Sequence, residues 1–379
     1  MKLAVLAGNR FSPWHFNVFR HTPGLQATGF RADSEIQRRF DERGADILPL
    51  PFEPVYFDTQ RGPLPLRVAN LLAERYRNRA PRLCPFHDRL RGFDALLSWE
   101  LFTEWTHEAL EAKAQNGVPV NVMVWDNILF NNEDTEAKRA TKARAFREAD
   151  RFLVHTERSR QMLLLEGADP ERIQLIPPGV DLHAFAPGQA QRGGEDTLTI
   201  LFVGWLLPRK GIDFLLQALR LLKERPGPRL RLLIAGSGPG EPRVRALVDR
   251  LGLSDDCTFL PPCPYADMPA LYHQADLFAL PSIATDTWQE QFGMALIEAM
   301  ACGVPVVSTL SGAIPEVVGD AGLLCQPNDF LSLAESIARL RADPALRQSL
   351  AAAGRRHAET HFCITAQARH LQSALVSRS

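Results

Sequence analysis

The sequence predicts an α/β protein of two doubly wound domains, in which each mostly parallel sheet is covered by helices on both faces. Short apolar runs typical of buried strands alternate with longer amphipathic stretches typical of helices. This alternation stops at a polar, Gly-rich stretch over residues 187–196 and then restarts. A length of 379 residues is enough for two ordinary domains.

We therefore expect Rossmann-like domains at 1–186 and 198–360, a linker at 187–197, and a final helix at about 361–379 that can pack back on the first domain. The strands expected in the first domain are residues 3–6, 47–50, 95–98, 120–124 and 151–154, and its helices include 33–43 and 136–149. The strands expected in the second domain are residues 199–203, 230–235, 277–280 and 304–307, and its first helix is 212–224. Open α/β sheets bind ligands beyond the carboxyl ends of their strands, so we expect both domains to face a central cleft.

The composition argues against several classes of protein. Lys and Arg total 43 against 44 for Asp and Glu, which argues against a nucleic-acid partner. No apolar run is long enough to span a membrane, and the first residues resemble a buried strand rather than a signal peptide. The six cysteines are scattered without a Cys-x-x-Cys pair, so we expect a reducing, cytoplasmic location and neither a metal nor a cofactor.

Residues 61–91 are locally basic, with apolar residues interleaved. The stretch contains eight arginines against Glu74 and Asp88. One interpretation is a site for an anionic acceptor, or a weak contact with anionic lipid at the inner membrane face. The interpretation that we favour is a solvated helix face with a buried apolar stripe, because charge runs usually serve solvation.

The stretch from residue 280 to 307 is the most informative part of the chain. An apolar strand is followed by a loop and then by a helix over about residues 293–302. A helix N-terminus presents free N–H groups and a positive dipole end, which together form an anion site. Glu290 precedes this helix and Glu298 lies within it, and such carboxylates suit sugar and ribose hydroxyls. The spacing equally fits a helix-capping Glu290 and a Glu298 in a surface ion pair.

This stretch closely resembles family 4 of the retaining glycosyltransferases, which have the GT-B fold. The family pattern is E-G-F-G-[LM]-x-x-x-E-A-M-A-x-G-x-P-V-V, and residues 290–307 match it except at Gln291, where the family usually has Gly. The resemblance implies that Glu290 lies beside the transferred sugar and that Glu298 holds the ribose hydroxyls. It also implies that the backbone amides of Phe292, Gly293 and Met294 bind the donor phosphates.

A second segment, residues 202–213, carries Arg209 and Lys210 in the turn after a strand. Paired cations there suit a diphosphate and would stabilise charge on a leaving group, although a bare Arg-Lys pair is usually only an exposed turn. The family reads V-G-R-L-x-x-x-K-G, so Lys210 corresponds to its phosphate-binding Lys, whereas Trp205 replaces its Arg. An indole cannot neutralise phosphate, and Arg209 is the candidate substitute. The other residues expected to bind the donor are Gly204, Trp205, Gly238 and Ser282.

Residues 235–241 form a Gly-rich run that imitates the dinucleotide fingerprint of an oxidoreductase, with Asp256 about twenty residues further on. The spacing fails, because Glu241 stands where the third Gly is required. We interpret the run as the family's G-x-G-P loop, which lies beside the nucleotide.

The N-terminal half resembles the family less closely. Gly8 and Asn9 stand where many members have a Gly-Gly loop, and Trp125 replaces a His that contacts the donor sugar. We expect these residues to line the cleft, with Asp126 or Asn127 toward sugar hydroxyls. A core Trp and a turn-forming Asp-Asn pair is the alternative.

The resemblance implies an enzyme that moves a hexose-type sugar from a UDP- or GDP-sugar to a hydroxyl of a carbohydrate or lipid-linked acceptor, with retention of configuration. The absence of an Asp-x-Asp motif implies that no metal is needed. Such a reaction would serve glycan, glycolipid or polysaccharide biosynthesis. The alternative is a catalytically degenerate nucleotide-binding or scaffold protein on the same fold, which Trp205 and Trp125 suggest. The sequence leaves the nucleotide, sugar, acceptor, linkage and oligomeric state open.

Overall fold

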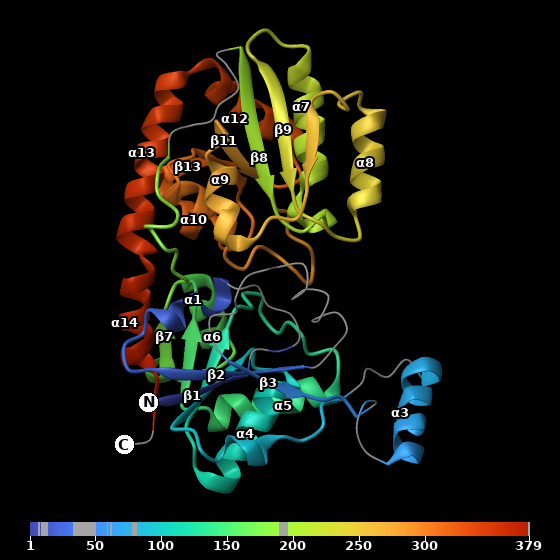
Figure 1. Ribbon diagram of the computed structural model, residues 1–379, viewed down its shortest axis with the longest axis vertical. Helices are drawn as coiled ribbons and strands as arrows, with labels where there is room; N and C mark the ends of the chain where they lie inside the picture. The colour runs from blue at the N-terminus through green and yellow to red at the C-terminus, as the bar shows by residue number, and fades with distance from the viewer. Residues whose placement is uncertain are drawn as a thin grey trace. The chain divides into compact units, whose positions relative to one another are not determined.

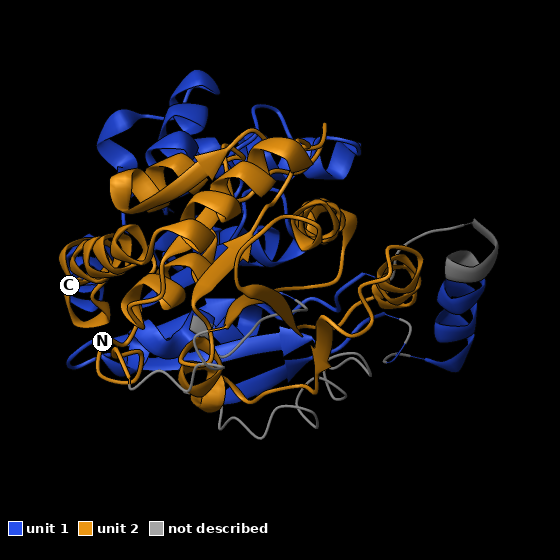
Figure 2. Ribbon diagram, turned by 90° about the horizontal axis from the view of Figure 1, so that it is seen from above, with its two compact units in different colours: residues 1–176, 367–379 blue, residues 177–366 orange. Residues whose placement is uncertain are grey.

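The computed structural model describes residues 1–6, 8, 14–32, 51–58, 60, 63–77, 82–188 and 196–377. The chain divides into two compact units, Met1–Ile176 with Gln367–Ser379, and Pro177–Ala366 (Figure 2). The predicted strand 47–50, the predicted helix 33–43 and most of the predicted linker lie outside the described residues.

The first unit ends earlier than the predicted domain end at residue 186. The reason is that the chain after Ile176 already packs within the second unit. Val180 pairs with Cys363 in a β-bridge, and the Phe185 ring packs 5.4 Å from the Tyr265 ring between centroids. Tertiary pairing therefore sets this boundary, rather than the polar stretch.

In the described part of the first unit, the sheet has seven parallel strands in the order β3-β2-β1-β4-β5-β6-β7 (Figure 1). These strands are β1 (Lys2–Leu6), β2 (Gln26–Ala32), β3 (Phe52–Val55), β4 (Ala95–Trp99), β5 (Val120–Val124), β6 (Arg151–Val154) and β7 (Ile173–Leu175). The helices described here are α1 (Trp14–Arg20), α3 (Leu64–Arg77), α4 (Glu104–Asn116), α5 (Glu136–Glu148), α6 (Glu157–Leu165) and α14 (Ile364–Ala374), with short 3-10 turns η1 (His87–Leu90) and η2 (Pro170–Arg172). The strand order reverses between β1 and β4, so the carboxyl ends of these two strands flank the switch point of the sheet.

Both faces of this sheet are buried, as parallel strands require. Successive residues of a strand point to opposite faces, so Leu96 belongs to one apolar core and its neighbour Leu97 to the other. The first core contains Leu110 of α4, and the second contains Leu371 of α14. The last helix is therefore part of the core of the first unit.

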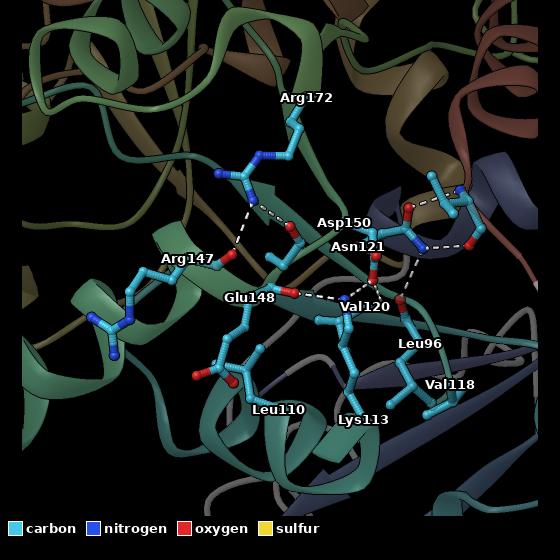
Figure 3. A network of polar contacts seen from close by, with 12 residues as sticks. Leu96, Leu110, Lys113, Val118, Val120, Asn121, Arg147, Glu148, Asp150 and Arg172 are labelled. Atoms are coloured by element: carbon cyan, nitrogen blue, oxygen red, sulfur yellow. Dashed lines mark hydrogen bonds and ion pairs between the residues drawn. The ribbon is translucent and has the colours of Figure 1, made fainter. Parts of the chain in front are cut away.

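Asn121 of β5 fastens the C-terminal tail to this sheet (Figure 3). Its Nδ2 donates to the carbonyl oxygens of Leu96 and Val376 at 3.2 and 3.0 Å, and its Oδ1 accepts from the Val376 N–H at 2.9 Å. Nearby, Asp150 accepts from Lys113 Nζ at 2.6 Å and from the Val120 N–H at 2.8 Å. Because a buried amide must be hydrogen-bonded, Asn121 specifies where the tail lies.

In the described part of the second unit, the sheet has six parallel strands in the order β10-β9-β8-β11-β12-β13. They are β8 (Thr197–Val203), β9 (Arg229–Ala235), β10 (Cys257–Leu260), β11 (Leu277–Leu280), β12 (Val306–Thr309) and β13 (Gly322–Cys325). The helices described here are α7 (Ile212–Lys223), α8 (Glu241–Arg250), α9 (Met268–Tyr272), α10 (Met294–Ala301), α11 (Ile314–Val318), α12 (Phe330–Ala342) and α13 (Pro344–His361). The strand order reverses between β8 and β11, which places the switch point of this sheet at their carboxyl ends.

The favoured interpretation of the basic stretch is wrong, because its apolar residues are not a buried stripe. In α3, the side chains of Leu64 and Leu66 are 70% and 54% exposed. Among the described residues, no helix is both long and apolar enough to cross a membrane.

Candidate functional site

Two loops meet at the switch point of the second unit, one after β8 and one after β11. They are locked together by backbone contacts, since the Ile283 N–H donates to the Arg209 carbonyl at 2.9 Å. Gly211 has φ of +70°, and a Cβ added there would lie 1.8 Å from the carbonyl oxygen of Pro281. Only glycine allows both this left-handed backbone and this approach. The fold thus brings together residues that are far apart in the sequence.

The side chains of Lys210, Ser282 and Glu290 form one polar cluster in these loops. Lys210 Nζ lies 2.9 and 2.7 Å from the two carboxylate oxygens of Glu290, and Ser282 Oγ donates to Glu290 at 2.6 Å. The side chains of Lys210 and Glu290 are 17% and 7% exposed, so the pair is largely shielded from water. A buried ion pair of this kind is a poor source of stability, which makes a functional role the better explanation.

The backbone of Glu290 is fixed by the loop after β12. The Ala313 N–H donates to the Glu290 carbonyl at 2.9 Å. Gly312 has φ of +57°, and a Cβ added there would lie 2.1 Å from that same carbonyl oxygen. Three loops, after β8, β11 and β12, therefore hold the carboxylate in place.

Trp288 covers the two cations, and the sequence analysis did not identify it. Its ring centroid lies 4.5 Å from the Arg209 guanidinium carbon and 5.0 Å from Lys210 Nζ, within range of cation–π attraction. Burial lowers the pKa of Arg209, and its Nε has no hydrogen-bond partner among the described residues. Trp205, by contrast, is 46% exposed. The position of Trp288 in the sequence, two residues before Glu290, was the signal that could have predicted its contact with the two cations.

Helix α10 begins shortly after Glu290 in the sequence, at a glycine N-cap. Its N-cap residue, Gly293, has φ of +94° and makes no side-chain hydrogen bond to the helix. Glu290 also contacts Lys210 and Ser282, and the alternative in which it caps this helix stays a prediction. Phe292 and Met294 are buried, so their side chains belong to the core. Only their backbone N–H groups can bind a ligand at the start of the helix.

Glu298 is buried between two tyrosines, so the alternative of a surface ion pair is wrong. Its carboxylate oxygens accept from Tyr265 Oη at 2.9 Å and from Tyr272 Oη at 2.7 Å. Burial raises the pKa of Glu298 to about 7, although both tyrosine hydrogen bonds oppose this shift. Its expected contact with ribose stays a prediction, since ribose would have to share or replace these partners.

The Gly-rich loop after β9 packs against the loop after β8. A Cβ at Gly236 would lie 1.9 Å from the Gly204 carbonyl, and Gly238 has φ of +151°. These glycines therefore allow the loop after β9 to pack closely against the loop after β8. Asp256, which a dinucleotide site would require, is paired instead with Lys223 and Arg229 at 2.8 Å each.

In the first unit, the expected cleft residues follow β1 and β5, except that Asn9 lies outside the described residues. Gly8 has φ of +85°. Asp126 organises the turn after β5, because its carboxylate accepts backbone N–H groups from Asn127 and Ile128 at 2.9 and 3.2 Å. The turn-forming interpretation of Asp126 and Asn127 therefore has direct geometric support.

Trp125 is half-buried and packs against a second residue that the sequence analysis missed. Its ring centroid lies 3.8 Å from that of His155, which directly follows β6. His155 Nδ1 lies 2.7 Å from the Ile176 carbonyl, so this nitrogen carries the proton, and Nε2 has no partner among the described residues. Burial lowers the pKa of His155 to about 4, which keeps the ring neutral and makes Nε2 a hydrogen-bond acceptor.

Glu100, directly after β4, is the other residue that was missed. It has a left-handed backbone with φ of +64°, which is uncommon for a residue other than glycine and often marks a functional position. Its Oε1 accepts from the N–H groups of Trp125 and Asp126 at 3.1 and 3.2 Å, while Oε2 is buried and has no partner among the described residues. Burial, and next the charge of Asp126, raise the pKa of Glu100 to about 8. The only sequence signal was its place at the end of an apolar strand.

Residues 189–357 match the family model described as "Glycosyl transferases group 1". A D-inositol 3-phosphate glycosyltransferase of Saccharomonospora viridis is 32% identical over 337 residues, covering 82% of this chain and 74% of that protein. Proteins of the same name from Thermomonospora curvata and Mycobacterium bovis are 37% and 39% identical over 235 and 230 residues. These two matches cover 56% of this chain but only 53% and 46% of the relatives, about half their length.

Two solved structures have the same fold. Anabaena HepE in complex with UDP superposes with a TM-score of 0.75 at 19% identity, covering 98% of this chain and 99% of that one. The sucrose-phosphate synthase of Thermosynechococcus elongatus gives a TM-score of 0.76 at 20% identity, with 98% of both chains covered. At such identities the likeness extends to the fold alone, and it confirms the predicted pair of Rossmann-like domains.

Proposed function

Because the chain belongs to the glycosyl transferases group 1 and has the GT-B fold, we propose that it transfers a hexose-type sugar from a UDP- or GDP-sugar to an acceptor hydroxyl with retention of configuration. The acceptor is a carbohydrate or a lipid-linked compound, and the product enters a glycan, glycolipid or polysaccharide. The observation that carries this proposal is the contact between Lys210 and Glu290 at the switch point of the second unit.

The donor diphosphate is bound by charge and by backbone amides. Lys210 and Arg209 supply two cations covered by Trp288, and the start of α10, whose N-cap is Gly293, supplies backbone N–H groups. Such preorganised groups stabilise the charge that develops on a departing phosphate. Arg209 Nε, which finds no hydrogen-bond partner among the residues described, supports the role of Arg209 as the substitute for the Arg that Trp205 replaces.

Glu290 has two duties in this proposal. Its carboxylate positions the Lys210 ammonium, and it accepts hydrogen bonds from the hydroxyls of the transferred sugar. The bond from the anomeric carbon to the phosphate oxygen breaks while the acceptor oxygen attacks from the same face. The acceptor proton passes to the departing phosphate, so no protein nucleophile is needed. The protein contributes positioning and charge stabilisation.

The acceptor is proposed to bind at the strand ends of the first unit. There, the neutral His155 offers an acceptor nitrogen against the Trp125 ring, and Glu100 offers a buried carboxyl that contacts the Trp125 backbone N–H. An aromatic ring with a few convergent polar groups is typical of sugar and polyol sites. The relatives carry inositol 3-phosphate in their name, so this compound belongs in the acceptor panel.

The decisive experiment is a panel of UDP-, GDP- and ADP-sugars, measured for binding by calorimetry and for slow hydrolysis. Binding of one nucleotide together with sugar release would support the proposal. A chain that binds none of them would support the alternative of a scaffold protein, which the exposed Trp205 keeps open.

The place of the reaction is part of the same proposal. We place the chain in the cytoplasm, with a weak peripheral contact at the inner membrane face. The support for this is the arginine excess over residues 61–91.

A further inference from the structure

Helix α3 exposes apolar side chains over two successive turns. Leu64, Leu66, Val68, Leu71 and Leu72 are exposed to 70, 54, 45, 48 and 49%. Single exposed leucines are ordinary on a protein surface, but a contiguous group marks an interaction site. The group needs a partner to cover it.

The polar residues of these two turns are less exposed than the apolar ones. Arg67 and Asn70 are both half-buried, and Asn70 Nδ2 donates to the Asp58 carbonyl at 3.3 Å. On an ordinary surface helix the apolar face points inward and the polar face outward. In these two turns of α3 the apolar residues are instead more exposed than Arg67 and Asn70.

The two segments that flank α3, residues 56–58 and 82–84, pair with each other through their backbones in a clamp. The Asp58 N–H donates to the Arg82 carbonyl and the Cys84 N–H to the Tyr56 carbonyl, both at 2.8 Å. Phe57 and Leu83 form an antiparallel bridge at the same place. Beyond this clamp α3 stands apart from the sheet of its own unit, in both views (Figures 1 and 2). The apolar side of the helix is therefore displayed on a fixed base.

The charge of the sequence that contains α3 identifies the partner. Six of the eight arginines of the stretch lie between residues 61 and 82, where Glu74 is the only acidic residue. An exposed apolar helix within an arginine-rich stretch of sequence is typical of a helix that lies in the surface of an anionic bilayer. A second copy of the chain would bring two such arginine-rich stretches together, and a two-turn face is small beside a stable protein interface.

We propose that α3 is a membrane-docking helix, which inserts Leu64, Leu66, Val68, Leu71 and Leu72 into the surface of an anionic lipid bilayer. The basic residues at its flanks hold it there by attraction to lipid phosphates. Helix α3 would thus provide the membrane contact proposed above, whether or not the chain transfers the proposed sugar.

The test is flotation of the full chain with vesicles of phosphatidylcholine alone or with phosphatidylglycerol added. We expect binding to the anionic vesicles and a decrease as salt is raised. The triple variant Leu64→Gln, Leu71→Gln, Leu72→Gln should bind at least about tenfold less, since each lost apolar contact weakens insertion. Glutamine has a helix propensity close to that of leucine, so α3 itself should persist.

The matched control is Leu165→Gln with Leu331→Gln, which removes leucines that are 71% and 58% exposed on α6 and α12. The control should float like the wild-type chain, and all three proteins should unfold at similar temperatures. Equal flotation of the triple variant and the wild type, or equal binding to neutral vesicles, would overturn the proposal. So would a concentration-dependent dimer that the triple variant loses, because α3 would then bind a second copy. No donor or acceptor is present, so the result stands apart from any failure of the transferase assay.

Discussion

Lys210 Nζ lies 2.7 Å from Glu290 Oε2, although 80 residues separate the two along the chain. One residue follows β8 and the other follows β11, the two strands at which the order of the second sheet reverses. The pair therefore occupies the place where open α/β sheets bind their ligands.

Replacement of Lys210 by Ala should reduce kcat/KM for sugar transfer by at least about 100-fold, because a charge that stabilises the leaving group is lost. Nucleotide binding, measured by calorimetry, should weaken as well. Lys223→Ala is the matched control, since Lys223 also pairs with a carboxylate, Asp256, at 2.8 Å. Equal loss of activity in both variants would argue against a specific role for Lys210.

Replacement of Glu290 by Gln should separate binding from transfer. The Lys210 ammonium loses its anionic partner and becomes more available to a diphosphate, so the Kd for the nucleotide should fall. Transfer should nevertheless drop strongly, because the sugar hydroxyls lose a charged acceptor. Calorimetry and a transfer assay on one preparation test both parts. A variant that binds nucleotide more weakly would contradict the expectation that the Glu290 carboxylate competes with the diphosphate for the Lys210 ammonium.

Replacement of Gly211 by Ala should destabilise the second unit and weaken nucleotide binding. A Cβ there would lie 1.8 Å from the Pro281 carbonyl, at φ of +70°. Gly117→Ala is a close control, because Gly117 has φ of +71° with nothing within 4 Å of the added Cβ. The control should lose about 1 kcal/mol from backbone strain alone, and Gly211→Ala clearly more. Similar unfolding temperatures for the two variants would contradict the clash.

Glu100 should make the stability of the protein depend on pH. Its pKa is raised from 4.5 to about 8, so between these pH values the folded state binds more protons than the unfolded state. The free energy of unfolding should therefore fall as pH rises through this window, by the contribution of this group. Glu100→Gln removes that contribution. The thermal midpoint of the variant minus that of the wild type should therefore increase as the pH is raised from 4.5 to 8. A constant difference between the two proteins would contradict a buried, protonated Glu100.

Transfer should persist when divalent metals are removed. In the proposed site, Lys210, Arg209 and backbone amides bind the diphosphate. They stabilise the negative charge that a metal ion would otherwise stabilise. Activity in excess EDTA should equal that in magnesium. A loss that magnesium restores would show that the cations of the protein are insufficient.

The sequence by itself determined the strand–helix alternation, the ends of β8 and β11, and the candidacy of Lys210 and Glu290. These features are local, because apolar periodicity and short motifs report how each segment folds. Tertiary structure alone decided that Lys210 and Glu290 pair and that Glu298 lies between two tyrosines. It also decided that Glu100 and His155 are buried with side-chain atoms that find no hydrogen-bond partner in the described part of the chain. The periodicity of α3 likewise marked an apolar face without saying whether anything covers it. Long-range partners and burial depend on packing between segments distant in sequence, and no local pattern records that.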